Sequence, residues 1–361
     1  MTPIETVPQK NQDLAVRPEL PATASSPKAQ RIHALDFTKG ALVLIMVLYH
    51  WINYFIGIQW KYYFYLRFLT PSFIFITGFL ISHIYLSKYS AKDPSLWKRL
   101  VTRGLKLVAI FFVLNLARNL VVPLLGTGTV GQGFLSLANL FIVFVSGNLP
   151  TFGTKLVSFS ILVPISYVLI LSGLLIFPFR RYRRTFHIAC LVLLASIATL
   201  EIFGYVSYNL EYVAIGMMGV LSGFMLIEML NNVTRHLWIL AVAYAGYAIA
   251  ITVWNVSFPL LVAGVILNLL VLYVIGAYGN DTGLAKNEVI LLGKYSLFGY
   301  ISQVAILQAL SAGFQRMHLG FAALPVSFLA ALVLTIASVE AIDRARARFT
   351  SVNRLYKAVF A

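Results

Sequence analysis

The chain has 361 residues, of which 60% are hydrophobic and 11% are charged, and its mean hydropathy is +0.84. These values exclude an ordinary soluble globular protein and predict an integral membrane protein. The formal net charge of +16 does not indicate nucleic-acid binding, because the Lys and Arg residues are spread over short segments between apolar stretches.

The N-terminal segment 1–34 contains many Pro, Ala and Ser residues and has no apolar stretch of the kind that a signal peptide needs. We expect it to be a disordered cytoplasmic tail. The single cysteine, Cys190, lies in an apolar segment and predicts neither a disulfide framework nor a cysteine-based metal site.

Long apolar segments then recur along the chain, and each can cross a hydrocarbon core of roughly 30 Å at about 1.5 Å per residue. We expect an all-α, polytopic integral membrane protein with about ten transmembrane helices. The helical domain covers 35–343, and a basic cytoplasmic tail covers 344–361. The long external connection 126–154 predicts an interfacial or re-entrant segment. The expected spans are 36–57, 62–87, 104–125, 155–177, 186–206, 210–230, 236–254, 257–278, 289–314 and 321–341.

Positive charge alternates between the connections that join these spans. Short cytoplasmic loops retain Lys and Arg, whereas exported loops do not. The connections 126–154, 207–209 and 255–256 contain no Lys or Arg. We therefore predict that they are external and that both termini are cytoplasmic. The cations assigned to the cytoplasmic side are Lys88, Lys92, Lys98, Arg99, Arg103, Arg180, Arg181, Arg183, Arg184, Arg235, Lys286, Arg344, Arg346, Arg348, Arg354 and Lys357.

The first span carries a polar stripe. Asp36, Lys39 and His50 fall on one helical face, because eleven residues at about 100° each bring His50 to within roughly 20° of Lys39. Asn53 extends this stripe by one turn. Titratable groups at membrane depth are energetically costly and are usually retained for a site or a pairing role. The stripe is therefore a candidate functional site. The alternative is structural: Asp36 caps the helix, Lys39 reaches the interface, and His50 bonds to a neighbouring helix.

The third span carries a second polar face. Asn115, Arg118 and Asn119 follow one another at helical spacing. Arg118 is a candidate for stabilising an oxyanion or for anchoring a polar acceptor, and the alternative is a structural pair with a buried acid such as Glu201. Arg67, near the external end of the second span, lines an acceptor entrance or reaches lipid head groups.

Four local blocks resemble the transmembrane acyltransferase superfamily, which includes the acyltransferase-3 proteins and the heparan-glucosaminide acetyltransferases. The run RIHALDFTKGALVLIMVLYH and then FLTPSFIFITGFLIS are similar to its first two helices. KRLVTRGLKL and LGKYSLFGYISQ are similar to its third-helix entry and a late segment. Lys39 replaces the family's usual Arg, and Gln303 replaces its late His. The matching residues are Arg31, Leu35, Asp36, Lys39, His50, Pro71, Phe73, Phe75, Gly78, Phe79, Arg99, Arg103, Gly293, Lys294, Ser296 and Tyr300.

The resemblance implies transfer of an acyl group, acetyl or succinyl, from cytosolic acyl-CoA to a hydroxyl or amine of an externally presented saccharide. His50 acts as base or acyl carrier, so direct transfer and an acyl-imidazole intermediate both remain open. Asp36 and Arg118 complete the expected catalytic set. Expected to hold donor phosphates are Lys39, Arg99 and Arg103. Expected to bind substrate are Asn53, Arg67, Asn115, Asn119, Ser296, Tyr300 and Gln303.

No metal and no permanently bound cofactor are expected, and acyl-CoA serves as the co-substrate. The expected partners are the lipid bilayer, acyl-CoA and a saccharide or lipid-linked glycan acceptor, and a homo-oligomer is left open. The expected location is the bacterial inner membrane. Two other function classes compete with the enzyme: a transporter or flippase in which His50 relays protons, and a non-catalytic membrane scaffold.

Overall fold

The structure is a computed structural model. It describes residues 32–57, 61–86, 95–124, 133–147, 158–179, 183–205, 207–224, 236–254, 257–279, 284–318, 320 and 323–360. Within these residues every regular element is a helix and none is a strand. The expected tail 1–34 therefore lies almost wholly outside the described residues, as do the two ends of the connection 126–154, at 126–132 and 148–154.

Most elements are α-helices, whereas η1 and η3 are π-helical and η2 is a 3₁₀ helix. The elements are α1 (His33–Trp51), η1 (Ile52–Ile56), η2 (Lys61–Leu66), α2 (Leu69–Leu80), η3 (Ile81–Tyr85), α4 (Ser95–Leu124), α5 (Gly133–Ser146), α6 (Leu162–Phe179), α7 (Arg183–Ile202), α8 (Tyr208–Ser222), α10 (Leu237–Val253), α11 (Phe258–Tyr278), α12 (Leu284–Lys294), α13 (Ser296–Arg316), α14 (Leu324–Arg348) and α15 (Thr350–Phe360).

Seven helical stretches of the described chain are long and apolar enough to cross a membrane, so the all-helical polytopic class is supported. The apolar helices α6 and α10 are shorter, and α8 has 15 residues. The count of about ten spans stays a prediction. The seven stretches are His33–Ile56, Phe64–Tyr85, Ser95–Leu120, Thr185–Ile202, Phe258–Tyr278, Ser296–Arg316 and Leu324–Arg348.

The expected span 289–314 is wrong, because the structure divides it into α12 and α13 at the non-helical residue Tyr295. α12 crosses α1 so closely that a Cβ atom at Gly293 would lie 1.7 Å from the Asp36 carbonyl oxygen. Reciprocally, a Cβ atom at Gly40 would lie 1.7 Å from the Val289 carbonyl oxygen. Small residues at the crossing permit this close contact between the two backbones. α12 is therefore packed against α1, and the membrane-length helix begins only at Ser296.

Two other expected boundaries change at the ends of helices. α4 begins at Ser95, nine residues before the expected span 104–125. The expected tail 344–361 is helical where the structure describes it, because α14 continues to Arg348 and α15 follows from Thr350 to Phe360. In the segment 126–154, the described part contains α5, which packs against α4 and α8.

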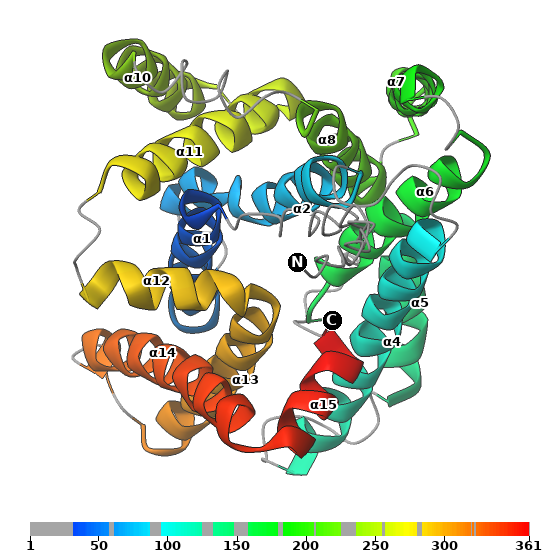
Figure 1. The fold of residues 1–361 in the computed structure, drawn as a ribbon. Helices are drawn as coiled ribbons and strands as arrows, with labels where there is room; N and C mark the ends of the chain where they lie inside the picture. Colours follow the sequence, from blue (N-terminus) through cyan, green and yellow to red (C-terminus); the bar gives the residue numbers. More distant parts are fainter. Residues whose placement is uncertain are drawn as a thin grey trace, which may run out of the picture. The chain divides into compact units, whose positions relative to one another are not determined.

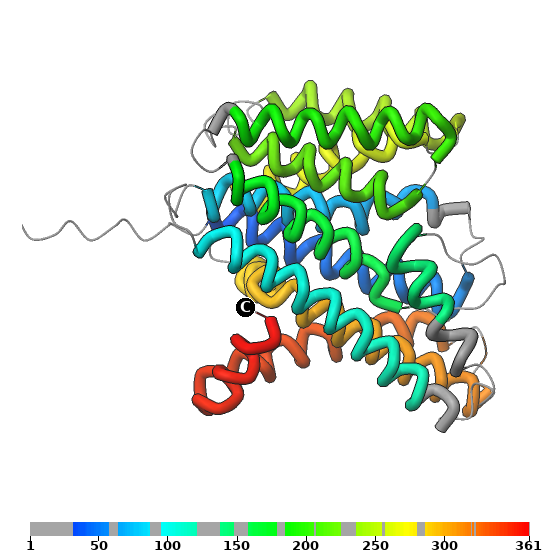
Figure 2. Tube along the Cα trace, turned by 90° about the vertical axis from the view of Figure 1, so that its right-hand side faces the viewer, coloured from blue at the N-terminus to red at the C-terminus, as the bar shows by residue number. Residues whose placement is uncertain are grey.

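Helix α1 lies in the interior of the helical body, where it contacts α2, α11, α12, α13 and α14 (Figure 1). Figure 2 shows the helices from the side, with α15 folding back from the end of α14. Helices α7 and α10 lie at the periphery and expose large apolar side chains, as expected for surfaces that face lipid. These exposed side chains include Ile188, Leu191, Val192, Trp238, Val242, Ile249 and Val253.

Candidate functional site

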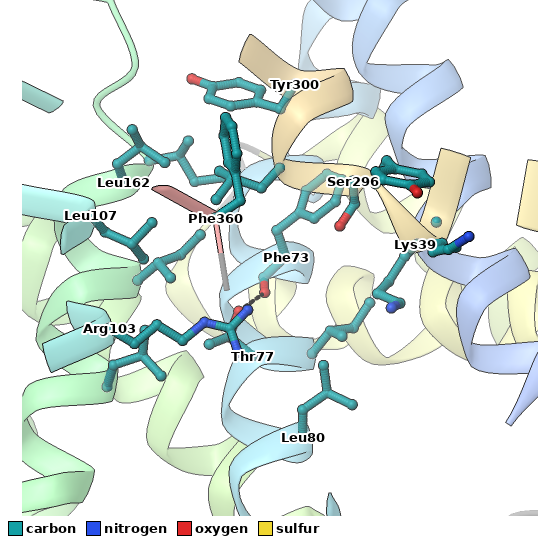
Figure 3. A pocket seen from close by; sticks show the side chains of 18 of the residues that line it. Lys39, Phe73, Thr77, Leu80, Arg103, Leu107, Leu162, Ser296, Tyr300 and Phe360 are labelled. Atoms are coloured by element: carbon teal, nitrogen blue, oxygen red, sulfur yellow. Dashed lines mark hydrogen bonds between the residues drawn. The ribbon is translucent and has the colours of Figure 1, made fainter. Parts of the chain in front are cut away.

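A cavity of about 210 Å³ lies among the beginnings of α1 and α13, the end of α2, the first half of α4, and helices α6 and α15. Four of the residues selected from sequence line it: Lys39, Arg103, Ser296 and Tyr300. In Figure 3, Lys39 from α1 and Arg103 from α4 approach from opposite sides, while Tyr300 lies at one end. Phe73, from the second block, lines it as well, so the fold joins residues from all four sequence blocks in one cavity.

The cavity wall carries three cations, each with a polar partner. The Lys39 ammonium lies 2.6 Å from an Asp36 carboxylate oxygen, so the two residues are neighbours as their spacing predicted. The Lys294 ammonium lies 2.8 Å from the Asp343 carboxylate. Arg103 donates a hydrogen bond to the Tyr85 hydroxyl (Figure 3).

Helix α15 supplies part of the same wall through Tyr356 and Phe360. The Arg346 guanidinium holds the helix: it lies 4.0 Å from the Tyr356 ring centroid and 5.2 Å from that of Tyr295, and it donates to the Asn353 side-chain oxygen. Burial raises the pKa of the Tyr356 hydroxyl to about 12, so that group stays neutral at physiological pH. The wall near α15 is thus aromatic and uncharged, although cations surround it.

His50 lies deeper along α1, about three turns from Lys39. Its ring centroid is 5.9 Å from that of Tyr300, which lines the cavity. On the other side, the Phe159 ring packs edge-on against Tyr300 at 6.0 Å. The His50 Nε2 atom is buried and has no hydrogen-bond partner among the residues that the structure describes. Tyr300 therefore lines the cavity and also contacts the ring of His50.

A polar network continues beyond His50. Gln308 donates to the Tyr54 hydroxyl at 2.9 Å and to the Ser158 hydroxyl at 3.2 Å. The Asn115 amide donates to the carbonyl oxygens of Phe111 and Ser158 and accepts from the Ser158 backbone N–H. Both N–H groups of Asn115 are used in this way, so its observed role is to hold Ser158 in place.

Arg118 is half-buried and interacts electrostatically with Tyr54, which places it near this network. Glu201, the acid considered as its structural partner, has a buried Oε1 atom without a hydrogen-bond partner, and its electrostatic neighbour is Glu211. No ion pair between Arg118 and Glu201 is present in the described part of the chain. Arg118 therefore lies near Tyr54, which follows His50 by four residues in the sequence.

The remaining selected residues lie outside the cavity wall. Arg99 is exposed on α4, one turn before Arg103. Arg67 precedes α2 and interacts electrostatically with Glu211. Asn53 in η1 and Asn119 in α4 are half-buried, and Gln303 in α13 is fully buried. The selected residues thus divide among a charged cavity, the surroundings of His50, and separate positions.

Sequence reasoning missed the contribution of the C-terminal residues. Arg346, Tyr356 and Phe360 either line the cavity or hold its α15 wall, although the sequence predicts only a basic tail over 344–361. A usable signal was present, because the apolar residues of α15 recur at helical spacing in TSVNRLYKAVF. Tyr85 was missed because a single Tyr near a loop carries no distinguishing pattern.

Comparisons of this chain with known protein families, with curated proteins and with solved structures find no match.

Proposed function

We propose that this protein is a membrane-embedded acyltransferase that moves an acetyl or succinyl group from cytosolic acyl-CoA to a hydroxyl or amine of an externally presented saccharide. The observation that carries the proposal is the cavity, in which the cations Lys39, Arg103 and Lys294 share a wall with Tyr300, whose ring lies against His50. A ligand with phosphates at one end and a narrow acyl-bearing arm at the other matches this arrangement.

The charges assign the two ends of the donor. Donor phosphates lie at the Lys39, Arg103 and Lys294 end, where a guanidinium and two ammonium groups give a local excess of cations over acids. The pantetheine arm runs along the apolar wall between α2 and α6 toward Tyr300, and the thioester reaches His50. The apolar residues of that wall include Phe73, Ile76, Leu80, Leu162, Ile165 and Leu169.

His50 then acts as the base. The acceptor oxygen or nitrogen attacks the thioester carbonyl carbon, the new bond forms as the C–S bond breaks, and the acceptor's proton passes through His50 to the departing thiolate. The buried, unpartnered Nε2 atom supports this role, because a nitrogen already engaged with the protein would have to break a bond first. An acyl-imidazole route uses the same nitrogen as nucleophile.

The proposed setting is the bacterial inner membrane, with about ten spans and both termini cytoplasmic, as the distribution of Lys and Arg supports. On a Cys190→Ala background, a cysteine at Ser95 should react with a membrane-impermeant reagent only from the inside, and one at Gly128 only from the outside. Gly128 lies outside the described residues. The reverse labelling of either position contradicts the ten-span topology.

The decisive experiment is thiol release by the purified protein in detergent, measured with acetyl-CoA and succinyl-CoA, with and without saccharide acceptors. Acceptor-dependent thiol release that disappears in His50→Gln supports an acyltransferase. A transporter or flippase predicts no thiol release with any acyl-CoA. In that case, uptake into proteoliposomes would decide between a transporter and a scaffold.

A further inference from the structure

Gln303, one of the polar residues selected from sequence, has no measurable solvent exposure. Both polar atoms of its amide group, Nε2 and Oε1, are buried, and no described residue is a hydrogen-bond partner of either atom. Buried amides in proteins almost always have partners, because an unsatisfied donor or acceptor carries the whole cost of its desolvation. A group left in this state points to a missing ligand or an ordered water.

The direction of Gln303 follows from its neighbours on α13. A Cβ atom at Gly299 would lie 3.3 Å from Cγ1 of Val43 on α1 and 3.6 Å from Cγ2 of Val339 on α14, so that position faces both helices. The ring of Tyr300 contacts His50, which is also on α1. At about 100° per residue, Gln303 projects between the directions of Gly299 and Tyr300, and therefore toward α1.

The same region contains the unpartnered His50 Nε2 atom. His50 contacts Tyr300 from α1, and Gln303 lies one turn after Tyr300 on α13; both have buried polar atoms for which the described residues supply no hydrogen-bond partner. One amide offers a neutral donor, and one imidazole nitrogen offers an acceptor. This combination suits a substrate that has a carbonyl oxygen next to a proton to be removed.

We propose that Gln303 binds the carbonyl oxygen of the donor's acyl group by donating a hydrogen bond from Nε2. The inference rests on the proposed function and assigns the acyl end of the donor to a named residue. The acyl group reaches Gln303 when the Tyr300 ring turns aside from the end of the cavity. A fixed, neutral donor buried among protein side chains also stabilises the oxygen as negative charge develops on it.

The test compares two unreactive CoA derivatives of nearly equal size. One carries an acetyl group joined through an amide in place of the thioester, and so keeps the carbonyl; the other is the S-ethyl thioether, which has none. Binding to the purified protein in detergent is measured by calorimetry. Wild-type protein should bind the carbonyl compound about tenfold more tightly, and Gln303→Leu should bind the two equally.

Gln308→Leu is the matched control, since it makes the same substitution on the same helix at an amide that already has partners. It should keep the tenfold preference and should lower the melting temperature. Gln303→Leu should not lower it, because an apolar side chain of similar size replaces an unsatisfied one. Gln303→His, which restores a donor, should recover part of the preference.

The outcomes separate this inference from the proposed function. If neither derivative binds wild-type protein, the assignment of the donor fails and the inference fails with it. If both bind and Gln303→Leu still prefers the carbonyl compound, the donor assignment stands and the role of Gln303 is overturned. A wild-type protein that binds the two derivatives equally overturns it as well.

Discussion

The candidate site has a charged end, with Lys39, Arg103 and Lys294, and a buried end, with His50 and Gln303. The two ends differ in whether their polar groups have partners. At the charged end, Lys39 and Lys294 have carboxylate partners, and Arg103 bonds to a tyrosine hydroxyl. At the buried end, His50 and Gln303 have polar atoms without partners. Paired cations near a surface bind anions without needing to change their own protonation, whereas unpaired groups in an apolar region are available for chemistry. The difference separates a binding end from a reacting end.

The largest expected effect is at His50, and it tests the reacting end. Gln and Ala both remove acid–base function, but Gln keeps polarity and can hydrogen-bond across helices. His50→Gln should therefore lose turnover almost as completely as His50→Ala, by about 100-fold or more, while the thermal shift with CoA persists. A folded His50→Gln protein that transfers acyl groups at a near wild-type rate would remove the distinction between the two ends.

A second, intermediate effect tests the binding end and uses two arginines of α4. Arg103→Ala should raise the apparent KM for acyl-CoA about tenfold with little change in kcat, because a charge-assisted contact to phosphate is lost. Arg99→Ala removes the same charge one turn away, at an exposed position outside the cavity wall, and should have a much smaller effect. Equal effects of the two variants would mean that only the general charge of this surface matters.

A smaller effect is expected at α15, which forms part of the charged end. Arg346→Ala removes the stacking on Tyr295 and Tyr356, so α15 should dock less firmly and bound CoA should dissociate about two- to fivefold faster. Stopped-flow displacement measures this rate. Arg354→Ala, which removes an exposed cation from α15 itself, is the control. An unchanged rate in Arg346→Ala would show that α15 does not retain the donor.

The smallest expected effect concerns stability and pH. Burial, followed by the hydrogen-bonded Glu340, raises the pKa of Glu288 above its usual value. The folded protein therefore holds this proton more tightly than the unfolded chain does. The resulting stability is present at pH below the ordinary value of about 4.5 and is lost as pH rises through the raised pKa.

Glu288→Gln should accordingly raise the melting temperature at pH 7 by about 1–2 °C and leave it unchanged near pH 4. Differential scanning fluorimetry across this range gives the comparison, with the low-pH points as the internal control. A lower melting temperature at pH 7 would show that the ionised carboxylate stabilises the fold and that the pKa of Glu288 is not raised.

Much of the local structure could be predicted because membrane helices are recognisable in a sequence as long apolar segments. The starts of α11 and α14 fall within a few residues of the expected spans. The Asp36 and Lys39 pair was also predictable, because residues three apart on one helix are neighbours. The break at Tyr295 was not, since it depends on the close crossing of α12 with α1, and hydropathy carries no information about the partner of a helix.

By itself, the sequence determined the helical membrane class and the polar stripe of α1 with Lys39, because these depend on composition and on spacing within single segments. Arg103, Ser296 and Tyr300 were selected through local sequence blocks that resemble a family. Only the tertiary structure decided that Arg103 lines the cavity whereas Arg99 does not, that α15 contributes to the wall, and that Asn115 is occupied by Ser158. Each of these depends on which helices pack together and in what rotation, and helix packing is set by side chains far apart in the chain.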